Sequence, residues 1–133
     1  MAQGSRRVTA SGNSLHVLVV DDDADVRGAI VEHLSREGFT VAEAADGVDA
    51  LSVVHRGVAF HAIVCDLQMP RLGGTDFLRM VRRRGYNPVM VILSGHFDLL
   101  ANTTGLGQVY ALAKPFDLGR LVSMLREALE ERS

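Results

Sequence analysis

The chain has 133 residues, a formal net charge of −2 at pH 7, 47% hydrophobic residues and 23% charged residues. These values are those of one globular domain with a sizeable core, and they give no electrostatic argument for nucleic-acid binding. The single cysteine, Cys65, excludes an intramolecular disulfide and a multi-cysteine zinc site. No apolar run approaches the ~20 residues of a membrane helix, and residues 1–7 lack the apolar core of a signal peptide. We therefore expect a cytoplasmic protein that is not inserted in a membrane.

Hydrophobic periodicity divides the chain into a tail and one domain. Residues 1–14 are rich in Ser, Gly, Arg and Asn without periodicity, which predicts a flexible tail before a domain at 15–131. Within the domain, short apolar runs alternate with segments of helical spacing. In chain order we expect a strand at 15–21, a helix at 24–37, a strand at 39–43, a helix at 47–56, a strand at 61–66, a helix at 75–84, a strand at 89–93, a weak helix at 97–106, a strand at 109–113 and a helix at 118–131.

This strict alternation predicts the fold class. Five strand–helix pairs favour an α/β fold with a doubly wound, five-stranded parallel sheet and helices on both faces. The flavodoxin-like strand order 2-1-3-4-5 places the first and third strands beside the switch point, where ligands bind outside the carboxyl ends of the strands. The first and third strands are the two that run into aspartates.

Three carboxylates are therefore expected in one pocket. Asp21 and Asp22 follow the first strand, and Asp66 ends the third. Such carboxylates repel one another unless a cation or a shared proton joins them, so a divalent-cation site and a proton-sharing acid site both stay open. Mg²⁺ prefers carboxylate ligands and often shares its site with a phosphate. Asp23 is expected to cap the following helix instead.

Two further polar residues end strands on the same edge. Ser94 closes the fourth strand, where its hydroxyl can donate to a phosphoryl oxygen, although Ser94-Gly95 alone also fits an ordinary turn. Lys114 follows the fifth strand, where it can pair with a carboxylate and offset charge on a transferring phosphoryl group. A lysine, a hydroxyl and three aspartates on one edge are harder to attribute to chance than any one of them.

Four segments carry a resemblance to a known family. They read VLVVDDDADVR, IVCDLQMPRLGG, VILSGH and AKPF, in that order, with 44 positions from Asp22 to Asp66. Over residues 15–131 the chain resembles the CheY-like receiver domain of two-component response regulators. The resemblance implies that Asp66 is the phosphoacceptor and that Asp21 and Asp22 hold Mg²⁺ or Mn²⁺ with it.

The resemblance also implies roles for the remaining motif residues. The backbone carbonyl of Gln68 would be a further metal ligand, and Ser94 and Lys114 would contact the phosphoryl group. Gly74 would be the family's loop glycine. The phosphoryl donor would be a sensor histidine kinase or a histidine phosphotransfer protein, and phosphorylation would switch the conformation that an output partner reads. Such a domain catalyses only its own phosphorylation and slow dephosphorylation, so we do not expect a conventional enzyme.

Some expectations about partners rest on this resemblance, and others stay open. We expect no direct binding of nucleic acid. A homodimer through the face formed by 97–106, 109–113 and 118–131 stays open, as does the choice between a single-domain protein and the receiver of a longer chain.

The chain departs from the family's pattern at one point. The family carries an aromatic residue three positions before the lysine, and Ala111 stands there, with Tyr110 one position earlier. A one-residue offset in a strand turns a side chain to the other face unless a bulge intervenes. The interval from Ser94 to Lys114, 20 positions, is also shorter than usual. We therefore expect a remodelled output surface near the weak helix and the fifth strand.

Three other functions are weighed against the residues at these positions. A receiver-like module that works by protein contact without phosphorylation is kept open by Ala111. A hydrolase of the haloacid dehalogenase type needs a second aspartate two residues after its nucleophile, where this chain has Gln68 after Asp66. In a flavodoxin-like flavin carrier, the aspartates at 21–23 would repel the phosphate of the flavin.

Overall fold

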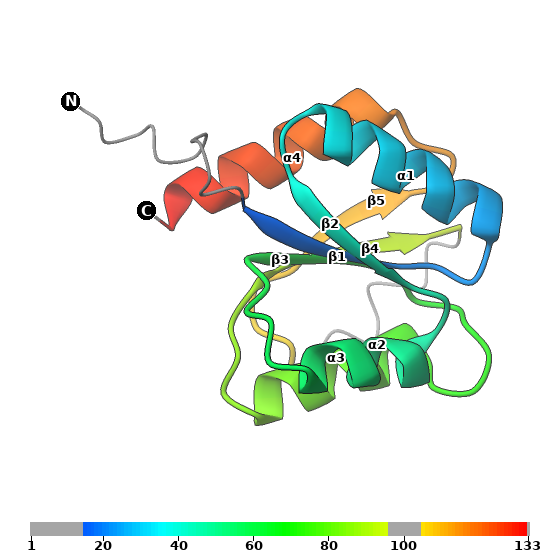
Figure 1. Cartoon of the computed structure of the whole chain (residues 1–133), viewed down its shortest axis with the longest axis vertical. Coiled ribbons are helices and arrows are strands. Elements are labelled where there is room, and N and C mark those ends of the chain that lie inside the picture. Colours follow the sequence, from blue (N-terminus) through cyan, green and yellow to red (C-terminus); the bar gives the residue numbers. More distant parts are fainter. Residues whose placement is uncertain (1–14, 96–104, 133) are drawn as a thin grey trace.

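A computed structural model describes residues 15–95 and 105–132 of the chain (Figure 1). Five parallel strands form one sheet in the order β2-β1-β3-β4-β5. The strands are β1 (His16–Val20), β2 (Thr40–Ala44), β3 (Ala62–Asp66), β4 (Val89–Ser94) and β5 (Tyr110–Ala113). The helices of the described residues are α1 (Ala24–Arg36), α2 (Gly47–His55), α3 (Gly74–Arg83) and α4 (Leu118–Glu131). The expected fold class and strand order are confirmed.

The expected elements that fall on described residues agree with the observed ones within one residue at each end. The weak helix expected at 97–106 falls mostly outside the described residues, and its last two positions, Gly105 and Leu106, are not helical. The tail at 1–14 also lies outside them. No helix among residues 15–95 and 105–132 combines the length and apolar character needed to cross a membrane.

The central strands feed two separate cores because successive side chains of a strand point to opposite faces. In β1, Val17 and Val19 pack beneath α1 and α4, whereas Leu18 and Val20 pack above α2 and α3. Figure 1 shows this arrangement, with α1 and α4 on one face of the sheet and α2 and α3 on the other. Cys65 lies fully buried in the second core, as a packing residue.

Aspartate caps fix where two of these helices begin. Asp23 accepts hydrogen bonds from the backbone N–H groups of Asp25 and Val26, at 2.9 and 3.2 Å, so its expected role as the cap of α1 is confirmed. Asp46 caps α2 by accepting from the N–H of Asp49 at 2.9 Å. Because the caps come three and two residues after the ends of β1 and β2, both helices start at the carboxyl-terminal edge of the sheet.

Candidate functional site

The three aspartates meet at the carboxyl-terminal edge of the sheet. Asp66 ends β3, and Asp21 directly follows β1, its parallel neighbour, in which Val20 is in register with Cys65. One carboxylate oxygen from each of Asp21, Asp22 and Asp66 lies within 4.8 Å of the others. The strand order thus brings together residues that are 44 positions apart in the sequence.

Burial differs sharply among these carboxylates. Asp21 is fully buried, Asp66 is 6% exposed, and Asp22 is exposed to solvent. A buried carboxylate is costly unless hydrogen bonds and opposite charges satisfy it. Asp21 Oδ1 accepts from the N–H of Asp23 at 2.9 Å, and Asp66 Oδ1 accepts from the N–H of Gln68 at 3.3 Å. Each buried side chain therefore keeps its second oxygen for another partner.

Lys114 is the partner of both second oxygens. Its Nζ lies 3.1 Å from Asp21 Oδ2 and 3.5 Å from Asp66 Oδ2. The backbone N–H of Lys114 donates to Ser94 O at 2.8 Å, which ties the residue to the end of β4, and the Lys114-Pro115 peptide bond is cis. Burial by itself lowers the pKa of Lys114, but its contacts with Asp21 and Asp66 outweigh burial and raise that pKa overall. The lysine is therefore charged at neutral pH.

Asp66 holds its proton more tightly than an exposed aspartate does. Burial is the largest cause and raises the pKa of Asp66, whereas the Gln68 N–H and the charge of Lys114 lower it. Asp21 and Asp22 raise it further by repulsion between like charges, and the net shift is upward. Additional positive charge at this position would stabilise the ionised carboxylate of Asp66 and offset its repulsion by Asp21 and Asp22.

The donor set fits a hard divalent cation. Three carboxylates and one lysine leave a local charge of −2, and carboxylate oxygens are the ligands that Mg²⁺ and Mn²⁺ prefer. Asp22 lies on the solvent side, where waters of a hydrated ion find room. The assignment of the Gln68 carbonyl as a further ligand stays a prediction.

Ser94 also lies at this edge, at the end of β4 and 2% exposed. In the sheet register it follows Leu93, the partner of Asp66, and it pairs with Ala113, the residue before Lys114. The expected site residues thus share one edge of the sheet.

Tyr110 does not occupy the place of the missing aromatic residue. The pairing of β4 with β5 is unbroken, with Val91 opposite Tyr110 and Ile92 opposite Ala111, so no bulge shifts the strand. Tyr110 packs against the core beneath α1 and α4, and its hydroxyl donates to Glu131 Oε1 at 3.3 Å. Ala111 faces the other side of the sheet and is exposed.

Two residues near the site, Asp46 and Arg71, were not identified as a pair from the sequence. Arg71, in the loop after Asp66, forms an ion pair with Asp46 at the start of α2. Asp46 directly before the expected helix at 47–56 is a recognisable capping signal. Its partner lies 25 positions away, and no local pattern reports such a pair.

Comparison with known proteins identifies the family. Residues 17–126 match the family described as the response regulator receiver domain. The chain belongs to this family. Among relatives of the receiver domain, the response regulator MprA of Mycobacterium ulcerans is 36% identical over 118 residues, which cover 87% of this chain and 50% of MprA. The uncharacterized transcriptional regulatory protein YcbL of Bacillus subtilis is 28% identical, over 84% of this chain and 50% of YcbL.

Solved structures of receiver domains share the fold. The chemotaxis protein CheY4 of Vibrio cholerae superimposes with a TM-score of 0.79 at 28% identity, covering 85% of this chain and 97% of CheY4. The receiver domain of the Francisella response regulator 1452 gives a TM-score of 0.80 at 28% identity, over 90% of this chain and all of that domain. The chain spans about half the length of the curated relatives it matches. Because relatives include a transcriptional regulatory protein, the expectation of no nucleic-acid binding is not confirmed.

Proposed function

We propose that this receiver domain accepts a phosphoryl group on Asp66 in a reaction that depends on Mg²⁺ or Mn²⁺, and that phosphorylation controls an output partner. The donor is a phosphohistidine on a sensor histidine kinase or a histidine phosphotransfer protein. One observation carries the proposal: the nearly buried Asp66 carboxylate lies within 4.8 Å of two other carboxylates and 3.5 Å from the Lys114 ammonium. This arrangement supports a nucleophilic role for Asp66, with neighbouring carboxylates to hold a cation and a lysine to offset negative charge.

The chain's own residues divide the work of phosphoryl transfer. A carboxylate oxygen of Asp66 forms a bond to phosphorus as the bond from phosphorus to the histidine nitrogen breaks. Gln68, whose N–H donates to Asp66 Oδ1, orients the nucleophile, and Lys114 offsets charge on the phosphoryl oxygens. A divalent cation bound by Asp21, Asp22, Asp66 and the Gln68 carbonyl would supply further positive charge to those oxygens.

Ser94 completes the proposed switch. Its side chain is nearly buried at the end of β4, next to the strand that carries Asp66. A dianionic group on Asp66 would attract the Ser94 hydroxyl and Lys114, and the surrounding loops would rearrange. Hydrolysis of the aspartyl phosphate would return the domain to its first state, so the domain acts as a phosphoacceptor with slow self-dephosphorylation.

A second function is favoured by Ala111. Receiver domains of the family carry at that position an aromatic side chain, which moves inward when the hydroxyl at the position of Ser94 is drawn to the phosphoryl group. Here the position is Ala111 and Tyr110 faces the other side of the sheet, so this chain has no aromatic side chain at that position to follow Ser94. A receiver that recognises its partner without phosphorylation would need no such movement. Phosphorylation with a small donor distinguishes the two functions.

The test uses acetyl phosphate and Mg²⁺, with the intact mass as the readout. We expect the wild-type chain to gain the mass of one phosphoryl group, and Asp66→Asn to gain none because an amide is not a nucleophile here. Asp76→Asn, which changes an exposed carboxylate of α3, is the matched control and should label like wild type. Absence of labelling in wild type, or equal labelling of Asp66→Asn, would contradict phosphorylation at Asp66.

A further inference from the structure

The loop that follows Asp66 is tied to the sheet at its first residue, and the first residue of α3 donates a hydrogen bond back to that loop residue. It runs from Leu67 to Gly73, between β3 and α3. The N–H of Leu67 donates to Leu93 O at 3.1 Å, and the N–H of Gly74 donates to Leu67 O at 3.2 Å. Between these ties the loop carries Gln68, which donates to the phosphoacceptor itself. The position of the loop therefore bears directly on the geometry of Asp66.

An ion pair anchors the middle of this loop to α2. Arg71 Nε and Nη2 donate to Asp46 Oδ2 at 2.8 and 2.5 Å, and Nη2 lies 3.6 Å from Asp49 Oδ1. The other oxygen of Asp46, Oδ1, caps α2. One carboxylate thus joins the first turn of a helix to the loop of the phosphorylation site.

This pair differs from the exposed ion pairs of the surface. The Asp46 side chain is 9% exposed, whereas both partners of the Arg36–Glu32 pair on α1 are more than half exposed. The hydrogen bond from the Asp49 N–H is the largest influence on the pKa of Asp46 and lowers it. Burial opposes that effect, Arg71 adds to it, and the net pKa is lowered. The Asp46 carboxylate is therefore ionised at neutral pH, and it is largely shielded from solvent.

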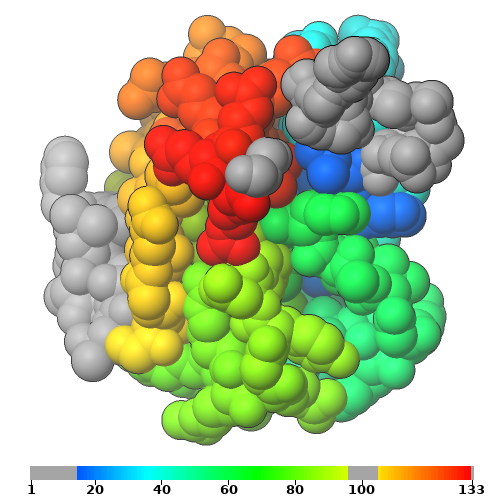
Figure 2. Space-filling model, turned by 90° about the vertical axis from the view of Figure 1, so that its left-hand side faces the viewer, coloured from blue at the N-terminus to red at the C-terminus, as the bar shows by residue number. Residues whose placement is uncertain are grey.

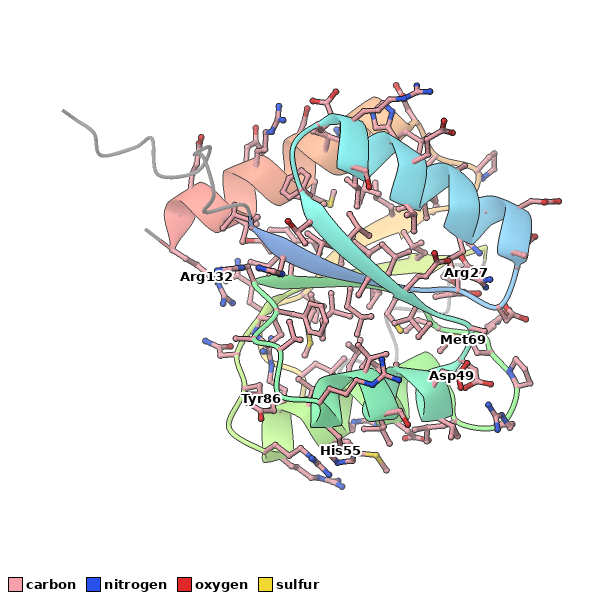
Figure 3. All side chains as sticks on the ribbon, in the orientation of Figure 1. Arg27, Asp49, His55, Met69, Tyr86 and Arg132 are labelled. Atoms are coloured by element: carbon pink, nitrogen blue, oxygen red, sulfur yellow. The ribbon has the colours of Figure 1, made fainter. Side chains whose placement is uncertain are left out.

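Backbone geometry and packing also tie the loop to α2. Arg71 has a φ of +66°, in the left-handed region that non-glycine residues adopt only rarely. A Cβ placed on Gly47, in the first turn of α2, would lie 2.5 Å from Leu72 O, so the loop backbone packs directly on that turn. Figure 3 shows Met69 of the loop and Asp49 of α2 at the same edge of the molecule, far from Tyr86 and Arg132.

We propose that Asp46 and Arg71 are positioning residues for the phosphorylation site, and that their ion pair sets the divalent-cation affinity of that site by fixing the loop that carries Gln68. This inference rests on the proposed function. Among the described residues, no hydrogen bond or ion pair joins Asp46 or Arg71 to Asp66, so both act through the loop. Removal of either charge frees the loop to shift Gln68, whose N–H orients Asp66 and whose carbonyl is an expected metal ligand.

Two substitutions remove the ion pair and spare the local structure. Arg71→Asn removes the charge, and asparagine adopts positive φ more readily than most residues. Asp46→Asn also removes a charge, and its side-chain oxygen still caps α2. Arg36→Asn is the matched control, because it removes an exposed arginine whose ion pair lies within α1.

Mg²⁺ binding is measured directly on the full chain, by titration followed through the backbone amide signals of Asp66 and Gln68. We expect the dissociation constant to rise about tenfold in Arg71→Asn and in Asp46→Asn, the loss typical when a residue that supports a metal ligand is removed. The double variant should bind no more weakly than the weaker single, since both changes break one interaction. Arg36→Asn should bind as wild type does, and Arg71→Lys should recover part of the affinity.

The rate of phosphorylation by acetyl phosphate, measured across Mg²⁺ concentrations, separates positioning from a merely structural role. The variants should need more Mg²⁺ to reach half of the maximal rate, and that maximal rate should stay near the wild-type value. Unchanged Mg²⁺ affinity in both single variants, while wild type is still phosphorylated, overturns this inference alone. A wild-type chain that is not phosphorylated at any Mg²⁺ concentration overturns the proposed function instead. Should Arg71→Asn fail to fold, Arg71→Gly, which also relieves the left-handed backbone, takes its place.

Discussion

The two edges of the sheet are formed by opposite ends of the same strands, and they carry different kinds of side chain. The carboxyl-terminal edge holds the buried carboxylates of Asp21 and Asp66 around Lys114. The amino-terminal edge holds two stacked imidazole rings, His16 and His61, with centroids 6.0 Å apart. The N–H of His16 donates to His61 Nδ1 at 2.9 Å, a bond that requires the ring nitrogen to be unprotonated. One edge concentrates charge, and the other depends on a neutral group.

The amino-terminal edge also contains an apolar cavity that is lined by residues from several elements. A cavity of about 270 Å³ lies beside the ends of α2 and α3, and its apolar lining includes Val54, Val58, Phe60, Ile63, Val81 and Tyr86. Figure 2 views this edge, where the end of α4 meets the segment before β4. Arg132 donates there to the carbonyl of Asn87. Within residues 15–95 and 105–132, the buried carboxylates of Asp21, Asp46 and Asp66 all lie at the edge where function is proposed.

The largest expected effect comes from Gly74, at the charged edge. A Cβ at this position would lie 2.2 Å from the carbonyl oxygen of Asp66, a contact with backbone that cannot yield easily. We expect Gly74→Ala to lower the free energy of unfolding by about 3 kcal/mol, measured by urea denaturation. Gly73→Ala is the matched control, since its Cβ would meet only Leu67 O at 3.7 Å. Equal stability of the two variants would contradict the tight packing of this loop.

Asp66→Asn is expected to stabilise the fold while it abolishes phosphorylation. Because the pKa of Asp66 is raised in the folded protein, its contribution to stability is present below the unfolded pKa of about 3.9 and is lost as the pH rises through the folded pKa. At pH 7 the neutral variant should therefore be more stable by about 1 kcal/mol, a typical size for one substitution. Urea denaturation should show the difference shrinking toward pH 4. Lower stability of Asp66→Asn at pH 7 would contradict the crowding of negative charge.

The neutral edge predicts the opposite pH dependence. Burial is the main cause that lowers the pKa of His61, and His16 adds to it. The stability that His61 contributes is thus present above the unfolded pKa of about 6.5 and is lost as the pH falls through the folded pKa. His61→Gln should flatten this part of the stability profile by less than about 1 kcal/mol, the net worth of one hydrogen bond. A ¹H–¹³C titration of the His61 ring measures its pKa directly, and a value above that of a model peptide would refute the prediction.

The smallest effect is expected at Tyr110, which also lies toward the neutral edge. Its hydroxyl contacts Glu131 and Gln108 in exposed positions, so Tyr110→Phe should change the free energy of unfolding by about 0.5 kcal/mol or less. Phosphorylation of Asp66 should be unaffected, because the ring faces away from Ala111. Backbone NMR chemical shifts recorded with and without beryllofluoride test whether Tyr110 responds to a phosphoryl mimic at Asp66. A large shift at Tyr110 that shows its ring moving to the face of the sheet on which Ala111 lies would contradict a remodelled output surface.

Local patterns in the sequence were enough to predict which segments form strands and helices and which residues end them. Apolar runs at 61–66 and 89–93 report buried strands because the period of a strand is local, and Asp23 reports a helix cap because its partners are two and three residues away. The alternation of elements also predicted the strand order, and with it the meeting of Asp21, Asp22 and Asp66 at one edge.

Only the tertiary structure decided which side chains pair across that edge. Lys114 contacts Asp21 from 93 positions away, and Arg71 reaches Asp46 from 25. Such pairs depend on the path of each loop and on packing between elements, which no hydrophobic period encodes. The side on which Tyr110 lies was likewise fixed by an unbroken register between β4 and β5, since a single bulge would have reversed it.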